Sequence, residues 1–261
     1  MRTAPTQPDL PWLEPDTPLP APERAWGPDT EAPGLLAAGA DLSASRLLQA
    51  YREGIFPWFS RGQPVLWWST DPRMVLQPAH LRLHRSLRQA IRRALRQSGL
   101  TLRVDQDFRD VMRACAGQHR PGQQGTWILP NMMTAYQDLH ELGHAHCLAL
   151  HQDGQLVAGL YWIDVGRAVF GESMFTTVTD GSKMALCTLA LMCRRAGVGM
   201  IDCQQQTEHL AFMGAAPLPR AQFLAHIRGV RDEPPVPWAT LGLYWRDLLH
   251  ELVHPAPGTP P

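Results

Sequence analysis

The sequence predicts an α/β fold of the mixed α+β kind, and two sets of patterns in the chain lead to this prediction. Helical periodicity runs up to a glycine, the usual residue just beyond a helix end, in two segments: 131–142 and 182–196. Alternating apolar and polar residues, typical of strands, fill three segments between those helices: 146–152, 156–163 and 168–174. Helices and strands that follow one another in this order indicate an α/β or α+β architecture.

The composition is that of a globular protein. The 261 residues suffice for one large domain or two small ones, and 44% of them are hydrophobic and 18% charged. The formal net charge of zero identifies no partner, and no apolar run approaches the ~20 residues of a membrane span. The five cysteines show no CxxC spacing, and the N-terminus shows no secretory signal. We therefore expect a reduced, cytoplasmic protein without a membrane segment.

The first quarter of the chain is rich in proline and then in aromatic residues. Residues 1–33 carry many prolines and little apolar periodicity, so we expect a loosely ordered extension. A helix is predicted over 43–52, with Ser43 as its N-terminal cap. An aromatic segment at 54–59 and an aromatic strand at 64–68 follow.

A basic helix predicted over 80–97 gives the clearest chemical signal. Its apolar residues fall on one face, and its arginines fall on the opposite face: Arg82, Arg85, Arg88, Arg92, Arg93 and Arg96. Between Pro72 and Val104 there are eight arginines and no acidic residue. Solvated surface helices usually mix Glu with Lys or Arg, so this arginine face favours contact with the phosphate backbone of a nucleic acid.

A strand is predicted over 199–203 and a short helix over 207–213. Glu172 and Asp202 place carboxylates in apolar surroundings, where such groups need partners. Either a structural network or a functional site explains them. Cys203, beside Asp202, fits a thiol nucleophile less well than a small buried strand residue.

The segment from His140 to His144 matches the HExxH pattern of zinc peptidases, with Glu172 as a conceivable third ligand. That pattern requires both histidines on one face of a continuing helix. Gly143 instead indicates the end of the helix, which leaves His144 beyond it. A second match at 250–254, just before a proline, shows how easily the pattern arises by chance. A zinc peptidase therefore remains only an alternative.

Several strings in the chain resemble the leucyl/phenylalanyl-tRNA–protein transferase family. They occur in family order over about 36–223, as GIFPWF at 54–59, LWWS at 66–69, DPR at 71–73, GTWI at 125–128, AY at 135–136, LHELGHAH at 139–146, GESMF at 171–175, SK at 182–183 and IDCQ at 201–204. Such a match is far more specific than any single motif. A non-catalytic RNA-binding module is the second alternative to this reading.

The resemblance implies a fold and an activity. It implies a small N-terminal domain at 34–72, an acetyltransferase-like (GNAT) aminoacyl-transfer domain at 73–236, and a C-terminal segment with a tail at 237–261. It also implies that Leu or Phe, and sometimes Met, passes from aminoacyl-tRNA to proteins with N-terminal Arg or Lys, which marks them for degradation. No metal and no cofactor are implied.

The same resemblance implies roles for individual residues. Asp202 orients or polarises Gln204 beside the acceptor amine, and Glu172 offers a carboxylate to a cationic group. The aminoacyl-adenosine is expected to bind to Trp58, Trp127, Tyr136, Phe170, Met174 and Phe175. The chain departs from the family pattern at several positions: Ala158, Trp162, Thr176, Phe212 and Met213.

Overall fold

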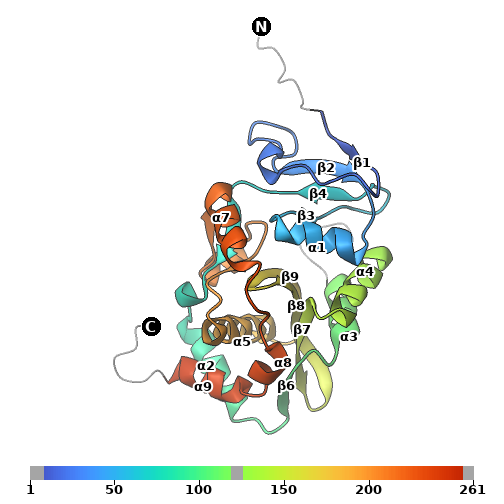
Figure 1. The fold of residues 1–261 in the computed structure, drawn as a ribbon. Helices are drawn as coiled ribbons and strands as arrows, with labels where there is room; N and C mark the ends of the chain where they lie inside the picture. Colours follow the sequence, from blue (N-terminus) through green and yellow to red (C-terminus); the bar gives the residue numbers. More distant parts are fainter. Residues whose placement is uncertain (1–8, 119–125, 255–261) are drawn as a thin grey trace.

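The computed structural model describes residues 9–118 and 126–254, which fold around two β-sheets with helices packed on them (Figure 1). The mixed α/β class predicted from the sequence is confirmed. Parts of the predicted N-terminal extension, of the GTWI string and of the C-terminal tail fall in 1–8, 119–125 and 255–261, outside the described residues.

The smaller sheet is built from the N-terminal part of the chain. Its strand order is β1-β2-β4-β3, with β1 at Trp12–Leu13, β2 at Leu35–Gly39, β4 at Leu66–Trp68 and β3 at Phe56–Pro57. Helix α1 (Ala44–Arg52) packs beside β3 and buries Leu47 and Tyr51. The Ser43 hydroxyl accepts a hydrogen bond from the Arg46 amide, so the predicted cap is confirmed.

Residues 9–33 are more ordered than the proline content suggests. β1 pairs in parallel with β2, and a short 3-10 helix, η1 (Pro22–Arg24), follows. Leu13 and Trp26 are buried. Proline restricts the backbone without preventing an extended strand at a sheet edge, and these apolar side chains supply the burial that fixes the segment.

The larger sheet has the strand order β11-β5-β10-β9-β8-β7-β6. Its strands are β11 (Ala216–Leu218), β5 (Arg73–Leu76), β10 (Ile201–Asp202), β9 (Ala168–Thr176), β8 (Gln155–Val165), β7 (Ala145–Gln152) and β6 (Leu100–Val104). β9 and β10 run parallel, and the other neighbours in this sheet run antiparallel. The three long strands predicted from alternation are confirmed as β7, β8 and β9.

Helices cover both faces of the larger sheet (Figure 1). One core lies beneath α2 (Arg85–Leu95), α5 (Gly181–Ala196), α8 (Trp238–Gly242) and α9 (Trp245–Val253). The other lies beneath α3 (Phe108–Gly117) and α4 (Pro130–Glu141) and continues into the smaller sheet. β7 supplies both by alternation, since Leu148 and Leu150 enter the first core and Cys147 and Ala149 the second.

Glycine ends two of the predicted helices. Gly143 follows α4 with a φ of 79°, and Gly197 follows α5 with a φ of 73°. The short helix α6 (Glu208–Phe212) is capped by the Thr207 hydroxyl, which accepts from the Leu210 amide. These three helices confirm the boundaries expected from the sequence to within a residue or two.

The basic helix starts later than predicted. A 3-10 turn, η2 (Pro78–His80), comes first, and α2 begins only at Arg85. The Arg82 amide donates to the Met213 carbonyl at 2.9 Å, and His84 has an extended backbone, so the segment between them cannot be helical. Arg82 therefore lies outside the helix on which it was expected.

Helix α7 (Arg220–Val230) connects the two sheets. Its Phe223, Leu224 and Ile227 enter the core that the smaller sheet shares. Its first residue, Arg220, donates from Nη1 to the Ser69 carbonyl at 2.8 Å. Within the described residues, no helix combines the length and hydropathy that crossing a membrane requires.

Candidate functional site

The parallel strands β9 and β10 separate at one edge of their pairing. Their paired register ends with Asp202 opposite Phe170, where β10 stops and β9 continues. In α/β sheets, ligands usually bind where neighbouring parallel strands diverge beyond their carboxyl ends. Glu172 and Gln204 both follow this point, each two residues beyond the last pair.

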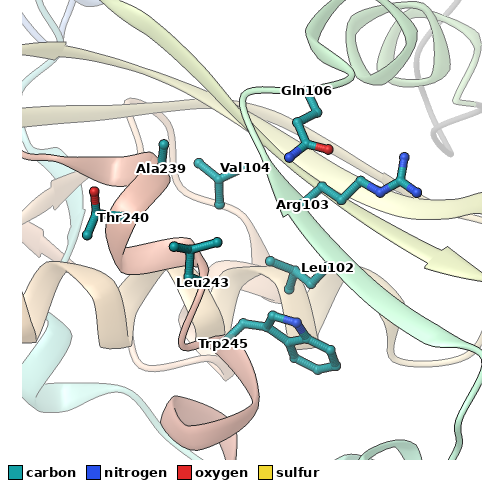
Figure 2. A pocket seen from close by; sticks show the side chains of 9 residues that line it. Leu102, Arg103, Val104, Gln106, Ala239, Thr240, Leu243 and Trp245 are labelled. Carbon is teal, nitrogen blue, oxygen red and sulfur yellow. The ribbon is translucent and has the colours of Figure 1, made fainter.

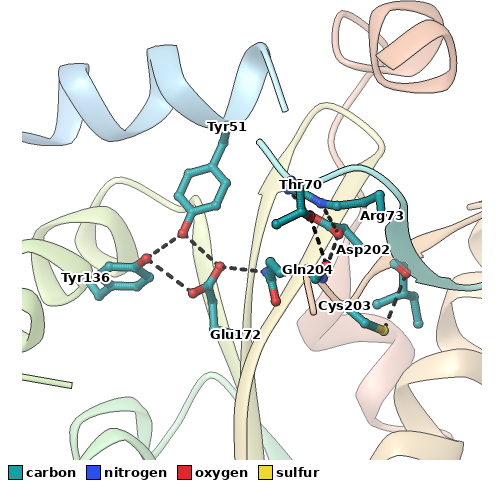
Figure 3. A network of polar contacts seen from close by, with 9 residues as sticks. Tyr51, Thr70, Arg73, Tyr136, Glu172, Asp202, Cys203 and Gln204 are labelled. Carbon is teal, nitrogen blue, oxygen red and sulfur yellow. Dashed lines mark hydrogen bonds and ion pairs between the residues drawn. The ribbon is translucent and has the colours of Figure 1, made fainter. Parts of the chain in front are cut away.

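A β-bulge sets the direction of Glu172. On β8, Tyr161 pairs with Ser173 and Trp162 pairs with Gly171, which leaves Glu172 as the extra residue on β9. A bulge bends a strand and turns a side chain away from the regular alternation. The Glu172 side chain accordingly points toward α1 and α4 (Figure 3).

Two tyrosines hold the Glu172 carboxyl. The Tyr51 hydroxyl donates to Oε1 at 2.7 Å, and the Tyr136 hydroxyl donates to Oε2 at 3.2 Å (Figure 3). The two phenol hydroxyls also contact each other. Tyr51 comes from α1 and Tyr136 from α4, and both side chains are buried. The site is therefore assembled from three separate elements.

This setting favours the neutral forms of the three residues. Burial raises the pKa of Glu172 from 4.5 to about 8; the tyrosine hydrogen bonds oppose this rise, and the nearby Asp202 charge adds to it. Burial and the Glu172 charge hold the pKa of Tyr51 and of Tyr136 well above the usual 10. A carboxyl with a pKa near neutrality changes charge readily when a cation approaches.

Asp202 contacts Gln204 through the backbone of Gln204. Asp202 Oδ1 accepts a hydrogen bond from the backbone amide of Gln204 at 2.9 Å, not from its side chain. Gln204 has a φ of 54°, a conformation that non-glycine residues adopt at a cost and that needs local support. Its side-chain Nε2 donates instead to Glu172 Oε1 at 3.5 Å.

Asp202 is bound chiefly to Arg73 of β5. The guanidinium donates from Nε to Oδ1 at 2.8 Å and from Nη2 to Oδ2 at 2.7 Å, and neither side chain has exposed surface. The Phe56 and Phe223 rings lie 4.6 and 4.5 Å from the guanidinium carbon. Asp202 is therefore a buried ion-pair partner that supports the backbone at Gln204.

The sequence patterns assign neither Tyr51 nor Arg73 to the site. The helical pattern places Tyr51 on the apolar face of its helix, and Arg73 is one of many arginines in its region. Arg73 is nevertheless the first residue of the apolar segment Arg73–Leu76. A charge in such a segment needs a buried partner of opposite sign, and this requirement points to a buried ion pair. Nothing in the local sequence indicates that Tyr51 reaches Glu172.

The six residues expected around the aminoacyl-adenosine differ in accessibility. Trp58, Trp127 and Met174 are half-buried and keep exposed surface. Tyr136 and Phe170 have 0% exposed surface, and Phe175 has 4%. The Phe170 ring packs against Tyr51, with 4.9 Å between centroids. These three rings belong to one core in this structure: Phe170 and Phe175 extend into it from β9, and Tyr136 enters it from α4.

The arginines expected to bind phosphate are not equivalent. Arg85, Arg93 and Arg96 are exposed on or beside α2, and Arg88 is half-buried. Arg92 is also half-buried, and its Nη2 donates to the Val253 carbonyl at 2.8 Å, so it anchors α9. Arg82 is exposed but precedes the helix.

The HExxH alternative lacks its required geometry. His140 stacks on Phe108 and its Nδ1 contacts the Ala145 carbonyl at 2.7 Å. His144 lies beyond the end of α4, with Nδ1 3.3 Å from the Asp164 carbonyl. Among residues 9–118 and 126–254, no three His, Cys, Asp or Glu side chains converge as a metal site.

The thiol alternative meets a similar difficulty. Cys203 is buried, its Sγ contacts the Ile201 carbonyl, and burial raises the pKa of its thiol. A protonated, enclosed thiol is a poor nucleophile.

Two hollows in the surface are lined by residues outside the Glu172 cluster, which consists of Glu172, Tyr51, Tyr136 and Gln204. One of about 350 Å³ opens between β6 and α8, with Arg103, Gln106 and Leu243 among its lining residues (Figure 2). Another of about 330 Å³ lies against the start of α1, beside Pro15 and Arg46. Neither is lined by Glu172 or Gln204, so we define the candidate site by its polar cluster.

Two family models and several curated proteins match this chain. The family model described as leucyl/phenylalanyl-tRNA protein transferase matches residues 75–228, and the model of that family's N-terminal domain matches 40–71. A leucyl/phenylalanyl-tRNA–protein transferase from Paraburkholderia xenovorans is 52% identical over 95% of this chain and 99% of its own length. One from Cupriavidus necator is 55% identical over 87% of this chain and 91% of its own length.

Solved structures show a weaker likeness. A GCN5-related N-acetyltransferase from Kribbella flavida aligns with 66% of this chain and 59% of its own, at 15% identity and a TM-score of 0.30. A likeness at that level assigns no activity.

Proposed function

This chain belongs to the leucyl/phenylalanyl-tRNA–protein transferase family and is an aminoacyltransferase, and we propose that it moves Leu or Phe, and to some extent Met, from aminoacyl-tRNA to proteins that begin with Arg or Lys. The product has a new hydrophobic N-terminal residue, which marks it for degradation through an N-degron pathway in the cytoplasm. The Paraburkholderia xenovorans relative is 52% identical over 95% of this chain, which supports the proposed donor and reaction class. The Glu172 cluster supports the acceptor.

The reaction needs positioning more than activation. The donor is an ester, so the acceptor nitrogen attacks the carbonyl carbon, the new C–N bond forms, and the ester C–O bond breaks. The nitrogen loses a proton and the ribose oxygen gains one. Holding the two reactants in register supplies several kcal/mol of barrier lowering without a covalent enzyme intermediate. The attacking α-amino group, with a pKa near ~8, must be neutral.

The Glu172 carboxyl is the observation that carries the acceptor proposal. Its pKa of about 8 leaves it largely neutral in the free protein at neutral pH. A guanidinium or ammonium group that approaches stabilises the carboxylate, so the proton leaves as the cation binds. Two tyrosine hydroxyls already donate to the carboxyl and fix its direction. A neutral or acidic N-terminal residue gains none of this stabilisation.

In this proposal, Gln204 receives the acceptor amine. Its Nε2 is directed at Glu172 Oε1, which leaves its carbonyl oxygen to accept a hydrogen bond from the attacking nitrogen. An amide is a poor base, so this contact orients the nitrogen, and the ribose hydroxyl or water carries the proton. Asp202 contributes through the backbone of Gln204.

The donor binds to the remaining surfaces in this proposal. Trp58 and Trp127 stack on the terminal adenosine, and Met174 contacts the aminoacyl side chain. Tyr136, Phe170 and Phe175 support that pocket from the core. The exposed arginines of α2 hold tRNA phosphates without reading their sequence.

A transfer assay with labelled leucyl-tRNA tests the proposal. Peptides that differ only in an N-terminal Arg, Lys, Ala or Glu serve as acceptors. We expect transfer to the Arg and Lys peptides, and a raised KM for the Arg peptide in Glu172→Gln. If none of the four peptides accepts leucine, the proposed reaction is wrong. If all four accept it equally, only the proposed acceptor preference is wrong.

A further inference from the structure

An exposed ring stack lies beside the basic helix, outside the site described above. Phe212, the last residue of α6, is 44% exposed. Its ring stacks on that of His84, with centroids 3.8 Å apart and planes 19° apart. His84 Nε2 also donates to the Phe212 carbonyl at 2.9 Å. The pair is therefore fixed both through its rings and through the backbone.

Lys183 supplies a positive charge beside this stack. The Lys183 ammonium lies 5.5 Å from the centroid of the Phe212 ring, close enough for a cation–π contact. Asp180 accepts a hydrogen bond from it at 2.7 Å and offsets part of its charge. Arg82 lies two residues before His84 in the chain and Arg85 directly after it, and both are exposed. An aromatic surface flanked by cations matches a nucleotide, whose base stacks and whose phosphate is an anion.

The stack lies between the two surfaces that the tRNA must reach. Helix α6 begins four residues after Gln204, and Phe212 ends it. The next residue, Met213, accepts a hydrogen bond from the Arg82 amide at 2.9 Å. One short helix thus connects the candidate reaction centre to the start of the arginine helix.

We propose that the His84–Phe212 stack, with Lys183 beside it, binds an unpaired nucleotide that precedes the terminal adenosine of the tRNA. This inference rests on the proposed function, because it assumes an RNA donor. Stacking on an aromatic ring tolerates any base, so the stack holds the single-stranded end of every donor tRNA alike. Its effect is to guide that end from the arginines to the reaction centre.

Two substitutions separate stacking from simple filling of space. Phe212→Leu keeps an apolar side chain but removes the flat ring, and Phe212→Trp keeps a ring. With leucyl-tRNA we expect Phe212→Leu to raise KM about tenfold, the typical effect of losing one stacked base, and Phe212→Trp to stay near wild type. With leucyl-adenosine, which lacks the preceding nucleotides, both variants should match wild type. Leu243→Ala, at a distant and 77% exposed residue, is the control.

A direct readout distinguishes nucleotide binding from a purely structural link between α6 and α2. We expect a tRNA with 2-aminopurine just before its terminal adenosine to lose fluorescence on binding the wild-type protein, and to keep it with Phe212→Leu. Equal fluorescence loss with both proteins overturns the inference, as does an equal KM change with leucyl-tRNA and leucyl-adenosine. Failure of the wild type to transfer leucine contradicts the proposed function instead.

Lys183 offers an independent measurement, since it is the only lysine in the chain. An amine-reactive reagent therefore modifies Lys183 and the N-terminus alone, and mass spectrometry separates the two. We expect saturating tRNA to slow modification of Lys183 several-fold. An unchanged rate at full tRNA occupancy overturns the placement of the nucleotide beside this residue.

Discussion

At the residue scale, the raised pKa of the Glu172 carboxyl lowers the stability of the folded protein. Its pKa is about 8 in the folded protein and near 4.5 when unfolded, so the folded form holds a proton that the unfolded form releases between those values. Because the folded state then binds more protons, its stability falls as pH rises from about 4.5 to about 8.

Glu172→Gln removes this dependence while it keeps the volume of the side chain. We expect the variant to exceed wild type in stability by an amount that grows from pH 5 to pH 8, on the order of 1–3 kcal/mol because water screens the half-buried carboxyl. Urea unfolding of both proteins at several pH values measures the difference. A difference that does not change with pH means that the folded pKa of Glu172 is close to its ordinary value.

The buried pair of Arg73 and Asp202 leads to a different expectation. Asp202→Asn leaves the Arg73 guanidinium buried without a counter-charge, which typically costs about 3–5 kcal/mol. We therefore expect a large loss of stability and, in the fraction that stays folded, slower transfer because the backbone of Gln204 loses its charged acceptor. Urea unfolding and single-turnover transfer from saturating leucyl-tRNA give the two quantities.

A matched control for Asp202→Asn is Asp110→Asn. Asp110 pairs with Arg113 at 3.3 Å, but both side chains are more than half exposed. Such a surface pair contributes about 0–1 kcal/mol, so this variant should unfold like wild type. If Asp202→Asn also unfolds like wild type, the ion pair is not a structural support for Gln204.

At the scale of elements, the arginines of α2 divide into exposed residues and one that anchors α9. Arg85, Arg93 and Arg96 are exposed, whereas Arg92 donates to the carbonyl of Val253. Changing the three exposed residues to alanine should weaken all tRNAs about equally. The slope of log K against log salt should become shallower by roughly 2–3, since each lost phosphate contact removes about 0.7–0.9.

Arg92→Ala is the matched control for that triple variant. We expect it to lower stability by about 1–3 kcal/mol, because a half-buried charged hydrogen bond to α9 is lost, with little change in the salt slope. Binding of two unrelated tRNAs over 50–200 mM salt, a range where several phosphate contacts change affinity strongly, measures the slopes. A triple variant with the wild-type slope removes α2 from the tRNA surface.

The sequence predicts the elements whose ends are set by nearby residues. α4 and α5 are followed by glycines in the left-handed conformation, and their lengths match the apolar periodicity. The sequence does not predict the short strands β5 and β6, because each has at most five residues and lies in the arginine-rich region that the helical pattern dominates. Their pairing is set by contacts with β10 and β7, far along the chain.

At the scale of the whole molecule, the candidate site also combines contacts that the sequence indicates with one that it does not. The family resemblance groups Glu172, Asp202 and Gln204, and hydrogen bonds connect them in the structure. The sequence could not reveal that Tyr51 completes this group, because that contact joins residues 121 positions apart. The distance between α1 and β9 depends on how the two sheets dock, which no local pattern specifies.

The docking of the two sheets is held at the end of α1. Arg231, just after α7, donates from Nη1 to the Arg52 carbonyl at 2.6 Å and contacts Glu53 Oε1 at the same distance. The Arg167 amide in the β8–β9 turn donates to the Val230 carbonyl at 3.0 Å. This arrangement ties the helix that carries Tyr51 to the hairpin that carries Glu172, so we infer that it sets the distance between those two side chains.

Arg231→Ala tests this connection. We expect a loss of about 1–3 kcal/mol in stability, since the half-buried guanidinium donates to both a carbonyl and a carboxylate. Transfer should also slow, with a raised KM for the Arg-initiated peptide, because a displaced Tyr51 no longer fixes the Glu172 carboxyl. Arg228→Ala is the control, because Arg228 pairs with Glu23 at 2.9 Å with both side chains about half exposed, and it should change neither quantity. Thermal melting and transfer kinetics measured on the same preparations give the answer. If Arg231→Ala loses stability but keeps the wild-type KM for the peptide, the position of Tyr51 does not depend on this contact between the two sheets.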